Sequence, residues 1–365
     1  MRTGPTASQP HNHGPEFRCD PVSGRWVVVA PDRALRPMAS GEGPIGDRVG
    51  VEQLPCPFCT GQEHDTPNEV FALREPGSKP DGPGWRLRVV PNRFPAVWLA
   101  ADWAPSQAHW DNPSPLLVRC PGIGRHEVVI ESADHITNPA LLPDELFRSL
   151  FATYRERMVA LATDPTANYA AVFKNVGTEA GASLGHTHSQ IIATPFVPDL
   201  IACELRGAND HFHQTGRCLF CDLVARERAD RARVVAETAG FVAVAAFAPR
   251  FGYEVWVLPT DHASRYESLT DTETADLAGL MKRVVRALDR ALGEPPYNWF
   301  LHTSPLRTSD SAAYHWHFEI VPRTSRPAGF EWGAGCFVTT VAPESAAAEL
   351  RAADRALPPP PPVVA

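Results

Sequence analysis

Two parts of the chain show the same succession of apolar and amphipathic segments. In each, a run rich in β-branched residues ends in Asp-His, at residues 127–135 and 254–262. An amphipathic segment follows each run and predicts a helix, over about 144–162 in the first part and 271–292 in the second. Each part then has an apolar strand, a His-x-His triplet and another strand. The pattern therefore predicts a duplicated α+β unit, with an antiparallel sheet and a packed helix in each half.

Local signals support both helices. Pro143 stands just before the first helix, where its fixed φ suits the first turn. Thr270, with Glu273 three residues later, predicts a capping box at the start of the second helix. The strands that follow the helices cover Tyr169–Phe173 and Asn298–Leu301. We expect the sheets of the two halves to join into one extended sheet or a half-barrel.

The two ends of the chain lack this pattern. Residues 1–16 are mostly polar, and residues 352–365 contain five consecutive prolines at 358–362, which favour a solvated polyproline segment. We expect both ends to be disordered. Between them, the repeat predicts an N-terminal half over residues 17–210 and a C-terminal half over residues 211–351.

The composition narrows the classes of partner. The 365 residues include 34 Lys and Arg against 42 Asp and Glu, a net charge of −8, which disfavours binding to nucleic acid. No apolar run reaches the roughly 18 residues of a membrane-spanning helix, so we expect no membrane partner. The N-terminal sequence lacks the apolar segment of a secretory signal, so we expect a cytoplasmic protein. A small phosphorylated ligand remains compatible, because it needs only a local basic site.

Four of the eight cysteines form two Cys-x-x-Cys pairs. In a chain without a secretory signal, such pairs indicate zinc or redox sites rather than disulfide bonds. Both pairs precede an Asp-His and a His-x-His in the same order, and zinc takes thiolate and imidazole ligands in closed structural sites. The repeat therefore predicts two structural zinc sites per chain. The predicted ligands are Cys56, Cys59, His135 and His186 in the first site, and Cys218, Cys221, His262 and His315 in the second.

The first His-x-His triplet also carries candidate chemistry. If a metal anchors His186, then His188 is held in place two residues later, and its neutral imidazole can attack a phosphate. The preceding residues 177–185 are rich in glycine, which lets backbone N–H groups approach phosphate oxygens. Ser183 and Gln190 offer neutral donors. By itself, such a glycine-rich segment is equally compatible with a plain connection between strands.

The triplet and its surroundings resemble a known family. The segment His186-Thr-His188-Ser-Gln190 is similar to the His-x-His-x-Gln motif of galactose-1-phosphate uridylyltransferases, the transferase branch of the histidine-triad superfamily. The resemblance covers residues 17–350 and implies a duplicated histidine-triad-like unit and a homodimer. Further motifs match in the same order, at Trp26–Pro37, Cys56–Cys59, Val90–Pro95, Asp134-His135 and Phe173–Asn175.

The resemblance also implies a reaction. Members of the family work by a ping-pong mechanism, in which one sugar phosphate leaves and a second attacks a nucleotidyl-histidine, here His188. The implied substrates are a nucleotide sugar and a sugar 1-phosphate. Arginine can grip two phosphate oxygens at once, which suits it to neutralise phosphate charge. The implied contacts are Gln190, Ser183 and Asn175 to the transferred phosphate, Arg33 and Arg36 to phosphate charge, and Asn92 and Phe94 to the nucleoside.

Departures from the best-known members leave alternatives open. Those members place a second metal on a glutamate and three histidines, and the positional matches are Glu204, His302, His315 and His317. This chain has Cys218 and Cys221 as well, which resembles the ADP-glucose phosphorylase-like subgroup and favours the Cys2His2 set. The base, uridine or adenosine, stays open, as does the acceptor, which is galactose 1-phosphate, glucose 1-phosphate or inorganic phosphate. Hydrolysis of a nucleotide sugar and a non-catalytic, zinc-stabilised nucleotide-binding module are the remaining hypotheses.

Overall fold

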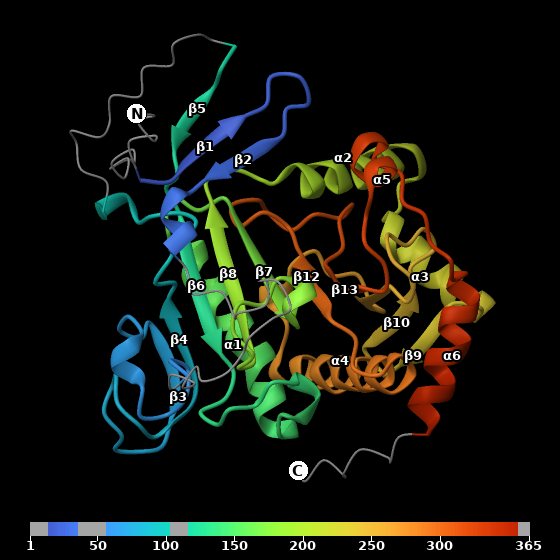
Figure 1. Cartoon of the computed structure of the whole chain (residues 1–365). Coiled ribbons are helices and arrows are strands. Elements are labelled where there is room, and N and C mark those ends of the chain that lie inside the picture. The colour runs from blue at the N-terminus through green and yellow to red at the C-terminus, as the bar shows by residue number, and fades with distance from the viewer. Residues whose placement is uncertain (1–13, 36–55, 103–115, 357–365) are drawn as a thin grey trace, which may run out of the picture.

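A ten-stranded antiparallel sheet forms the centre of the molecule (Figure 1). The structure, a computed structural model, describes residues 14–35, 56–102 and 116–356. Across the sheet the strand order is β3-β4-β6-β8-β7-β12-β13-β11-β10-β9. In that order the strands are β3 (Phe71–Arg74), β4 (Trp85–Pro91), β6 (Arg125–Ile130), β8 (His188–Thr194), β7 (Tyr169–Val176), β12 (Tyr297–His302), β13 (His317–Pro322), β11 (Val255–Pro259), β10 (Phe241–Ala245) and β9 (Val234–Glu237).

The strand order is the same in both halves when each is counted from its outer edge. The Asp-His strands β6 and β11 each pair with a His-x-His strand, β8 and β13, which in turn pairs with the central strands β7 and β12. Strands β7 and β12 pair with each other from Val176↔Tyr297 to Val172↔Leu301, so the halves share one sheet. This confirms the duplication and the extended sheet. The sheet is open rather than closed into a barrel.

Two long helices, α1 (Asp144–Ala162) and α4 (Asp271–Leu292), cover one face of the sheet. Both have the bounds that the amphipathic pattern predicts. The capping box is present, because Thr270 Oγ1 accepts the Glu273 N–H and the Glu273 carboxylate accepts the Thr270 N–H. Alternate residues of the strands, such as Val172 and Phe318, enter the same hydrophobic core as the helices. The remaining strand residues therefore project to the opposite face.

The opposite face differs between the halves. Over the C-terminal half, α3 (Leu219–Asp230) and a second apolar cluster cover the sheet. Beside the N-terminal half lies a small sheet of order β2-β1-β5 (Figure 1). Neither feature was predicted from the sequence. The remaining elements are β1 (Glu16–Cys19), β2 (Trp26–Val29), β5 (Arg119–Pro121), α2 (Asp199–Thr215), α5 (Gly329–Ala334) and α6 (Pro343–Arg355).

Three expected boundaries differ from the structure. Glu16, expected in a disordered end, begins β1, while residues 1–13 lie outside the described part. Residues 352–355, expected in the disordered tail, end α6, because Leu350 and Ala353 pack into the main core. The boundary expected at 210/211 falls inside α2. Residues 357–365, with the prolines, lie outside the described part.

Candidate active site

His188 is the first residue of β8, on the sheet face opposite α1 and α4. Its Nδ1 lies 2.7 Å from the His186 carbonyl oxygen. Since a carbonyl can only accept, Nδ1 carries the proton and Nε2 keeps a lone pair. The side chain is buried, with the Phe58 ring 5.3 Å away. Burial lowers the pKa of His188 to about 4, so the imidazole is neutral at pH 7.

A buried polar network fixes the strand beneath His188, on the helix-covered face. Lys174 Nζ donates to the His188 carbonyl oxygen (3.0 Å) and to the Glu131 carboxylate (2.6 Å). The other Glu131 oxygen accepts from Ser189 Oγ, which in turn accepts from the Tyr154 hydroxyl of α1. Because every described member of the network has a partner, it holds this part of β8 rigidly.

A cavity of about 270 Å³ lies on the sheet face that carries His188, although His188 itself does not line it. Gln190 and Ile192 line it, and they share the face of β8 that carries His188 because side chains alternate along a strand. Its size suits part of a small ligand rather than a polymer. The lining residues are Val28, Ala30, Arg33, Ala96, His126, Phe173, Asn175, Gln190 and Ile192.

The residues expected to bind substrate gather around this cavity. Arg33, Asn175 and Gln190 line it directly. Arg33 Nη1 donates to the Phe94 carbonyl oxygen (2.9 Å), and Asn92 Oδ1 accepts the Phe94 N–H (2.8 Å), so these two residues adjoin the cavity.

Two further expected residues stand apart from this group. Ser183 is partly buried in the segment that leads from the short helix Thr178–Ala180 to β8. Arg36 lies outside the described residues.

His126 is a cavity residue that the sequence analysis missed. It lies on β6, and its Nε2 is 2.9 Å from Gln190 Oε1. A single histidine between Arg125 and Glu127 gives no periodic or motif signal. Only the pairing register of β6 with β8, which places Val128 opposite Gln190, brings the two side chains together.

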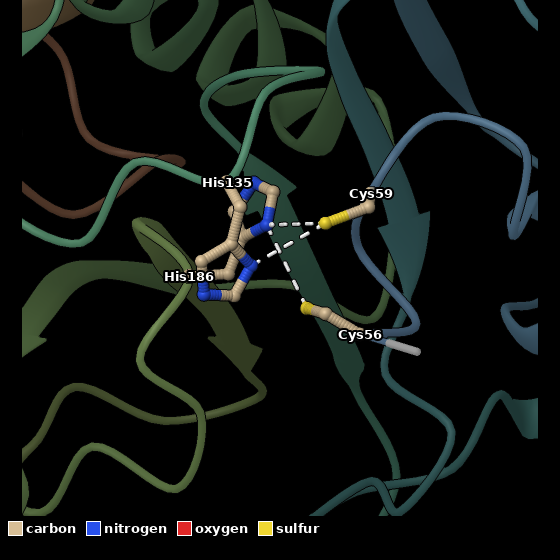
Figure 2. A group of neighbouring side chains, drawn as sticks. All are labelled: Cys56, Cys59, His135 and His186. Carbon is tan, nitrogen blue, oxygen red and sulfur yellow. Dashed lines mark hydrogen bonds between the residues drawn. The ribbon is translucent and has the colours of Figure 1, made fainter. Parts of the chain in front are cut away.

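The first predicted metal set converges, as Figure 2 shows. Cys59 Sγ lies 3.3 Å from His135 Nδ1 and 3.6 Å from His186 Nδ1, and Cys56 Sγ lies 3.6 Å from His186 Nδ1. Zinc–sulfur and zinc–nitrogen bond lengths place neighbouring ligands of a tetrahedron about 3.6 Å apart. His186 Nε2 donates to the Ser132 carbonyl oxygen (2.9 Å), which leaves Nδ1 free to bind. The donor set therefore fits zinc.

The thiol chemistry of this cluster also suits a cation. Burial and the neighbouring Cys56 sulfur raise the pKa of Cys59 to about 11. The Cys59 thiol would therefore stay protonated at pH 7 unless a positive charge lay beside the sulfur.

The second predicted set converges in the same way. Cys221 Sγ lies 3.4 Å from His262 Nδ1 and 3.6 Å from His315 Nδ1, and Cys218 completes the group as the residue before α3. His262 Nε2 donates to the Ser311 carbonyl oxygen (3.0 Å). Burial and the Cys218 sulfur raise the pKa of Cys221 to about 12. This set also fits zinc.

The residues expected as an alternative second metal site do not all lie together. His315 belongs to the cysteine cluster, and Glu319 joins Glu204, His302 and His317 in a separate group whose ligand atoms lie within 4.8 Å of one another. In this third group His302 Nδ1 is 2.9 Å from a Glu204 oxygen. Three Cys, His and Glu clusters are thus present in the described residues.

The C-terminal counterpart of the His188 site is buried and contains the carboxylate of Glu319, which pairs with Arg250. His317, which repeats His188, stacks on Trp256 at 5.0 Å and is fully buried. Glu319 stands where the first half has Gln190. Burial alone would raise the pKa of Glu319, but the His317 hydrogen bond and the charges of His302 and Arg250 hold it at about 2. A carboxylate there would repel a phosphate, so of the two His-x-His positions in the described residues the N-terminal one is the candidate for a phosphate site.

Sequence comparisons match both halves. The family description "Galactose-1-phosphate uridyl transferase, N-terminal domain" matches residues 6–198, and the corresponding C-terminal domain matches residues 204–328. The chain belongs to the galactose-1-phosphate uridyl transferase family. This confirms the resemblance seen in the motifs. Members of the family are enzymes, and the nucleotidyltransferase reaction expected for this chain fits that membership.

Relatives within the galactose-1-phosphate uridyl transferase family span both subgroups. The chain is 35% identical to ADP-glucose phosphorylase of Arabidopsis thaliana over 96% of each chain. It is 28% identical to galactose-1-phosphate uridylyltransferase of Thermotoga maritima, over 92% of this chain and 98% of the relative.

Solved structures agree with these relatives. The Arabidopsis phosphorylase with bound ADP-glucose aligns with a TM-score of 0.70, at 35% identity, over 93% of this chain and 99% of that one. A uridylyltransferase aligns with a TM-score of 0.75, at 29% identity, over 93% of this chain and 98% of that one. Among the described helices, none is long and apolar enough to cross a membrane.

Proposed function

We propose that the protein moves a nucleoside monophosphate between a nucleotide sugar and a phosphate acceptor, with His188 as the covalent carrier. The observation that carries this proposal is the Nδ1–H bond to the His186 carbonyl oxygen, which leaves a lone pair on Nε2 of a histidine on the sheet face that also carries the cavity. Gln190 and Asn175 line that cavity together with Arg33, and such groups stabilise phosphate oxygens.

In the first step, Nε2 of His188 attacks the α-phosphorus of the nucleotide sugar. The N–P bond forms as the bond between the α-phosphorus and the bridging oxygen breaks, and the sugar 1-phosphate leaves as an anion. The imidazole gains positive charge, which the His186 carbonyl oxygen stabilises through Nδ1–H. The leaving group is a stable phosphate, so the step needs no strong general acid.

In the second step, a phosphate oxygen of the acceptor attacks the same phosphorus. The new P–O bond forms, the N–P bond breaks, and His188 returns to its neutral form. The low pKa that burial gives His188 favours this return. The amide of Gln190, unlike a third histidine, cannot act as a base toward water, which disfavours hydrolysis.

Two acceptors are candidates. Transfer to a hexose 1-phosphate follows from the family, and relatives such as the Thermotoga enzyme bear that name. Transfer from ADP-glucose to inorganic phosphate is the second candidate, and the 35% identity to an ADP-glucose phosphorylase supports it. A panel of UDP- and ADP-sugars against galactose 1-phosphate, glucose 1-phosphate and inorganic phosphate separates them, because each pair forms a different nucleotide product.

We further infer that zinc occupies both Cys2His2 sets and acts structurally. Four protein ligands leave no open position for substrate. The first zinc would hold His186, and with it the turn whose carbonyl oxygen orients His188.

The decisive test is isolation of the intermediate. Incubation with radiolabelled UDP-glucose or ADP-glucose should label the wild-type protein through an acid-labile, base-stable bond at His188. His188→Gly should remove both the label and turnover, while keeping the zinc content and the circular dichroism of the wild type. Label that persists in His188→Gly would overturn the mechanism. His317→Asn is the matched control in the second half, and we expect it to keep the label.

A further inference from the structure

Two amide side chains line the cavity, and the orientation of each follows from the polar side chain that it contacts. A side-chain amide has an accepting oxygen and a donating NH2 group, and the hydrogen-bond network decides which one faces a ligand. For a phosphate the difference is large, because an NH2 group attracts the oxygens and a carbonyl oxygen repels them. Gln190 and Asn175 are these two amides.

A backbone group determines the orientation of Gln190. The Ala96 N–H donates to His126 Nδ1 (2.9 Å), and a backbone N–H can only donate. His126 Nδ1 is therefore unprotonated, and the neutral ring must carry its proton on Nε2. That proton points at Gln190 Oε1, 2.9 Å away. The Asn92 NH2 group lies 3.1 Å from the same nitrogen and, because both groups are donors, makes no hydrogen bond to it. The Gln190 NH2 group is consequently turned toward the cavity.

A guanidinium group determines the orientation of Asn175. Arg323 Nε donates to Asn298 Oδ1 (2.6 Å), and an arginine has no acceptor. The Asn298 NH2 group must then point the other way, and it lies 2.7 Å from Asn175 Oδ1 and 2.8 Å from the Ala180 carbonyl oxygen. Asn298 is on β12, opposite Asn175 of β7. The Asn175 NH2 group therefore faces away from Asn298. One of its N–H groups makes a long hydrogen bond to the Gly181 carbonyl oxygen (3.5 Å), and the second is left for the cavity that Asn175 lines.

We propose that His126 and Asn298 are positioning residues for phosphoryl transfer, each of which holds one amide with its NH2 group toward the transferred phosphate. The proposal rests on the proposed function, because it assumes that the phosphate occupies this cavity. It adds that the C-terminal half takes part in the reaction through Asn298, although its own His-x-His site is buried. Both positioning residues are buried, and the polar contacts described here direct each of them at an amide.

The first experiment measures the single-turnover rate of His188 labelling with radiolabelled ADP-glucose or UDP-glucose. His126→Leu removes the donor, and Asn298→Asp keeps the volume but turns an acceptor toward Asn175, which should reverse its amide. We expect each to lower the rate about 10- to 100-fold, as is typical when a residue that orients a ligand-binding group is lost. His126→Gln can still donate to Gln190 and should recover most of the rate. Zinc content and circular dichroism verify folding.

Double-mutant cycles separate positioning from a general structural effect. In a Gln190→Ala background, His126→Leu should have no further effect, whereas in Asn175→Ala it should keep its full effect. Asn298→Asp should show the reverse pattern, with no effect in Asn175→Ala and full effect in Gln190→Ala. If either substitution lowers the rate by the same factor in both backgrounds, it acts through stability or long-range charge and the proposal fails. A rate unchanged in both single variants also overturns it.

A third measurement does not depend on activity. In protein labelled with 15N-histidine, His126, assigned by its absence in His126→Gln, should show a protonated Nε2 and an unprotonated Nδ1. A protonated Nδ1 would overturn the Gln190 arm of the proposal whether or not the enzyme turns over. Failure of the wild type to form any adduct would instead count against the proposed function. The two failures are thus distinguishable.

Discussion

At the scale of single residues, one difference separates the two halves of the molecule. Both contain a His-x-His on the same sheet face, but the residue two positions further is Gln190 in one and Glu319 in the other. Glu319 is held as a carboxylate by Arg250, His302 and His317, while Gln190 is neutral and backed by His126. On the proposed function, the electrostatics of this position favour the N-terminal half as the phosphate site.

This comparison predicts the effect of Gln190→Glu. Besides losing one donor, the variant places a negative charge beside the transferred phosphate. We expect the labelling rate of His188 to fall at least about 100-fold, as when an oxyanion donor is removed. Gln190→Ala is the matched control and should lose less, because it adds no charge. A Gln190→Glu enzyme faster than Gln190→Ala would contradict this account.

At the scale of elements, the sequence predicted the helices and cysteine–histidine sets that occur in both halves, and missed the features that occur in only one half. The bounds of α1 and α4, and the convergence of both cysteine–histidine sets, followed from amphipathic periodicity and duplicated spacing. The roles of His126 and Asn298 depend on strand register and on single hydrogen bonds between distant segments, which leave no local pattern. The sequence analysis also missed that α3 covers the sheet of the C-terminal half, because α3 has no counterpart in the described part of the first repeat.

The capping box of α4 makes one stability prediction. Thr270→Ala removes the side-chain acceptor for the Glu273 N–H and should lower the free energy of unfolding by about 1 kcal/mol, measured by urea denaturation. Thr272→Ala, at an exposed position that is the second residue of the same helix, is the control and should cost nothing. Equal losses in the two variants would show that the cap is not what stabilises the helix.

A buried ion-pair network at β4 makes a pH-dependent prediction. Arg88 donates to Glu69 (2.9 Å) and Asp81 (2.9 Å), and Arg74 also donates to Glu69. Burial alone would raise the pKa of Glu69, but Arg74 and Arg88 hold it below its usual range. Glu69→Gln should therefore lower the free energy of unfolding by about 2 kcal/mol at pH 7.

The sign of the pH effect follows from that lowered pKa. The stabilisation is complete above the ordinary glutamate pKa of about 4.3 and is lost as the pH falls through the lower folded value. The difference between wild type and Glu69→Gln should thus shrink below about pH 4. Glu145→Gln, which removes an exposed pair with Arg86, should leave stability unchanged throughout. A Glu69→Gln deficit that does not change with pH would exclude the ion pair as its cause.

At the scale of the whole molecule, the metal content tests the duplicated sites together. We expect two zinc ions per chain, one lost in Cys56→Ser and the other in Cys218→Ser, measured by elemental analysis. Each loss should lower the melting temperature, because structural zinc contributes directly to folding. Cys203→Ser, at an exposed cysteine outside both clusters, is the control. Zinc that remains bound when Cys56→Ser and Cys218→Ser are combined would show a further metal site, for which Glu204, His302, His317 and Glu319 are the candidate ligands. The homodimer stays a prediction that light scattering can test.

The pairing of β7 with β12 has a consequence for how the chain can be divided. If the polypeptide were cut between its two repeats and the fragments separated, β7 and β12 would each lose their pairing partner. Each fragment would then expose an edge strand with unpaired backbone N–H and C=O groups, which favours aggregation. The amino-terminal fragment would also lose the anchor of Asn175. Although the sequence contains two similar repeats, each half depends on the other for the pairing of its central strand, so we expect neither half to function alone.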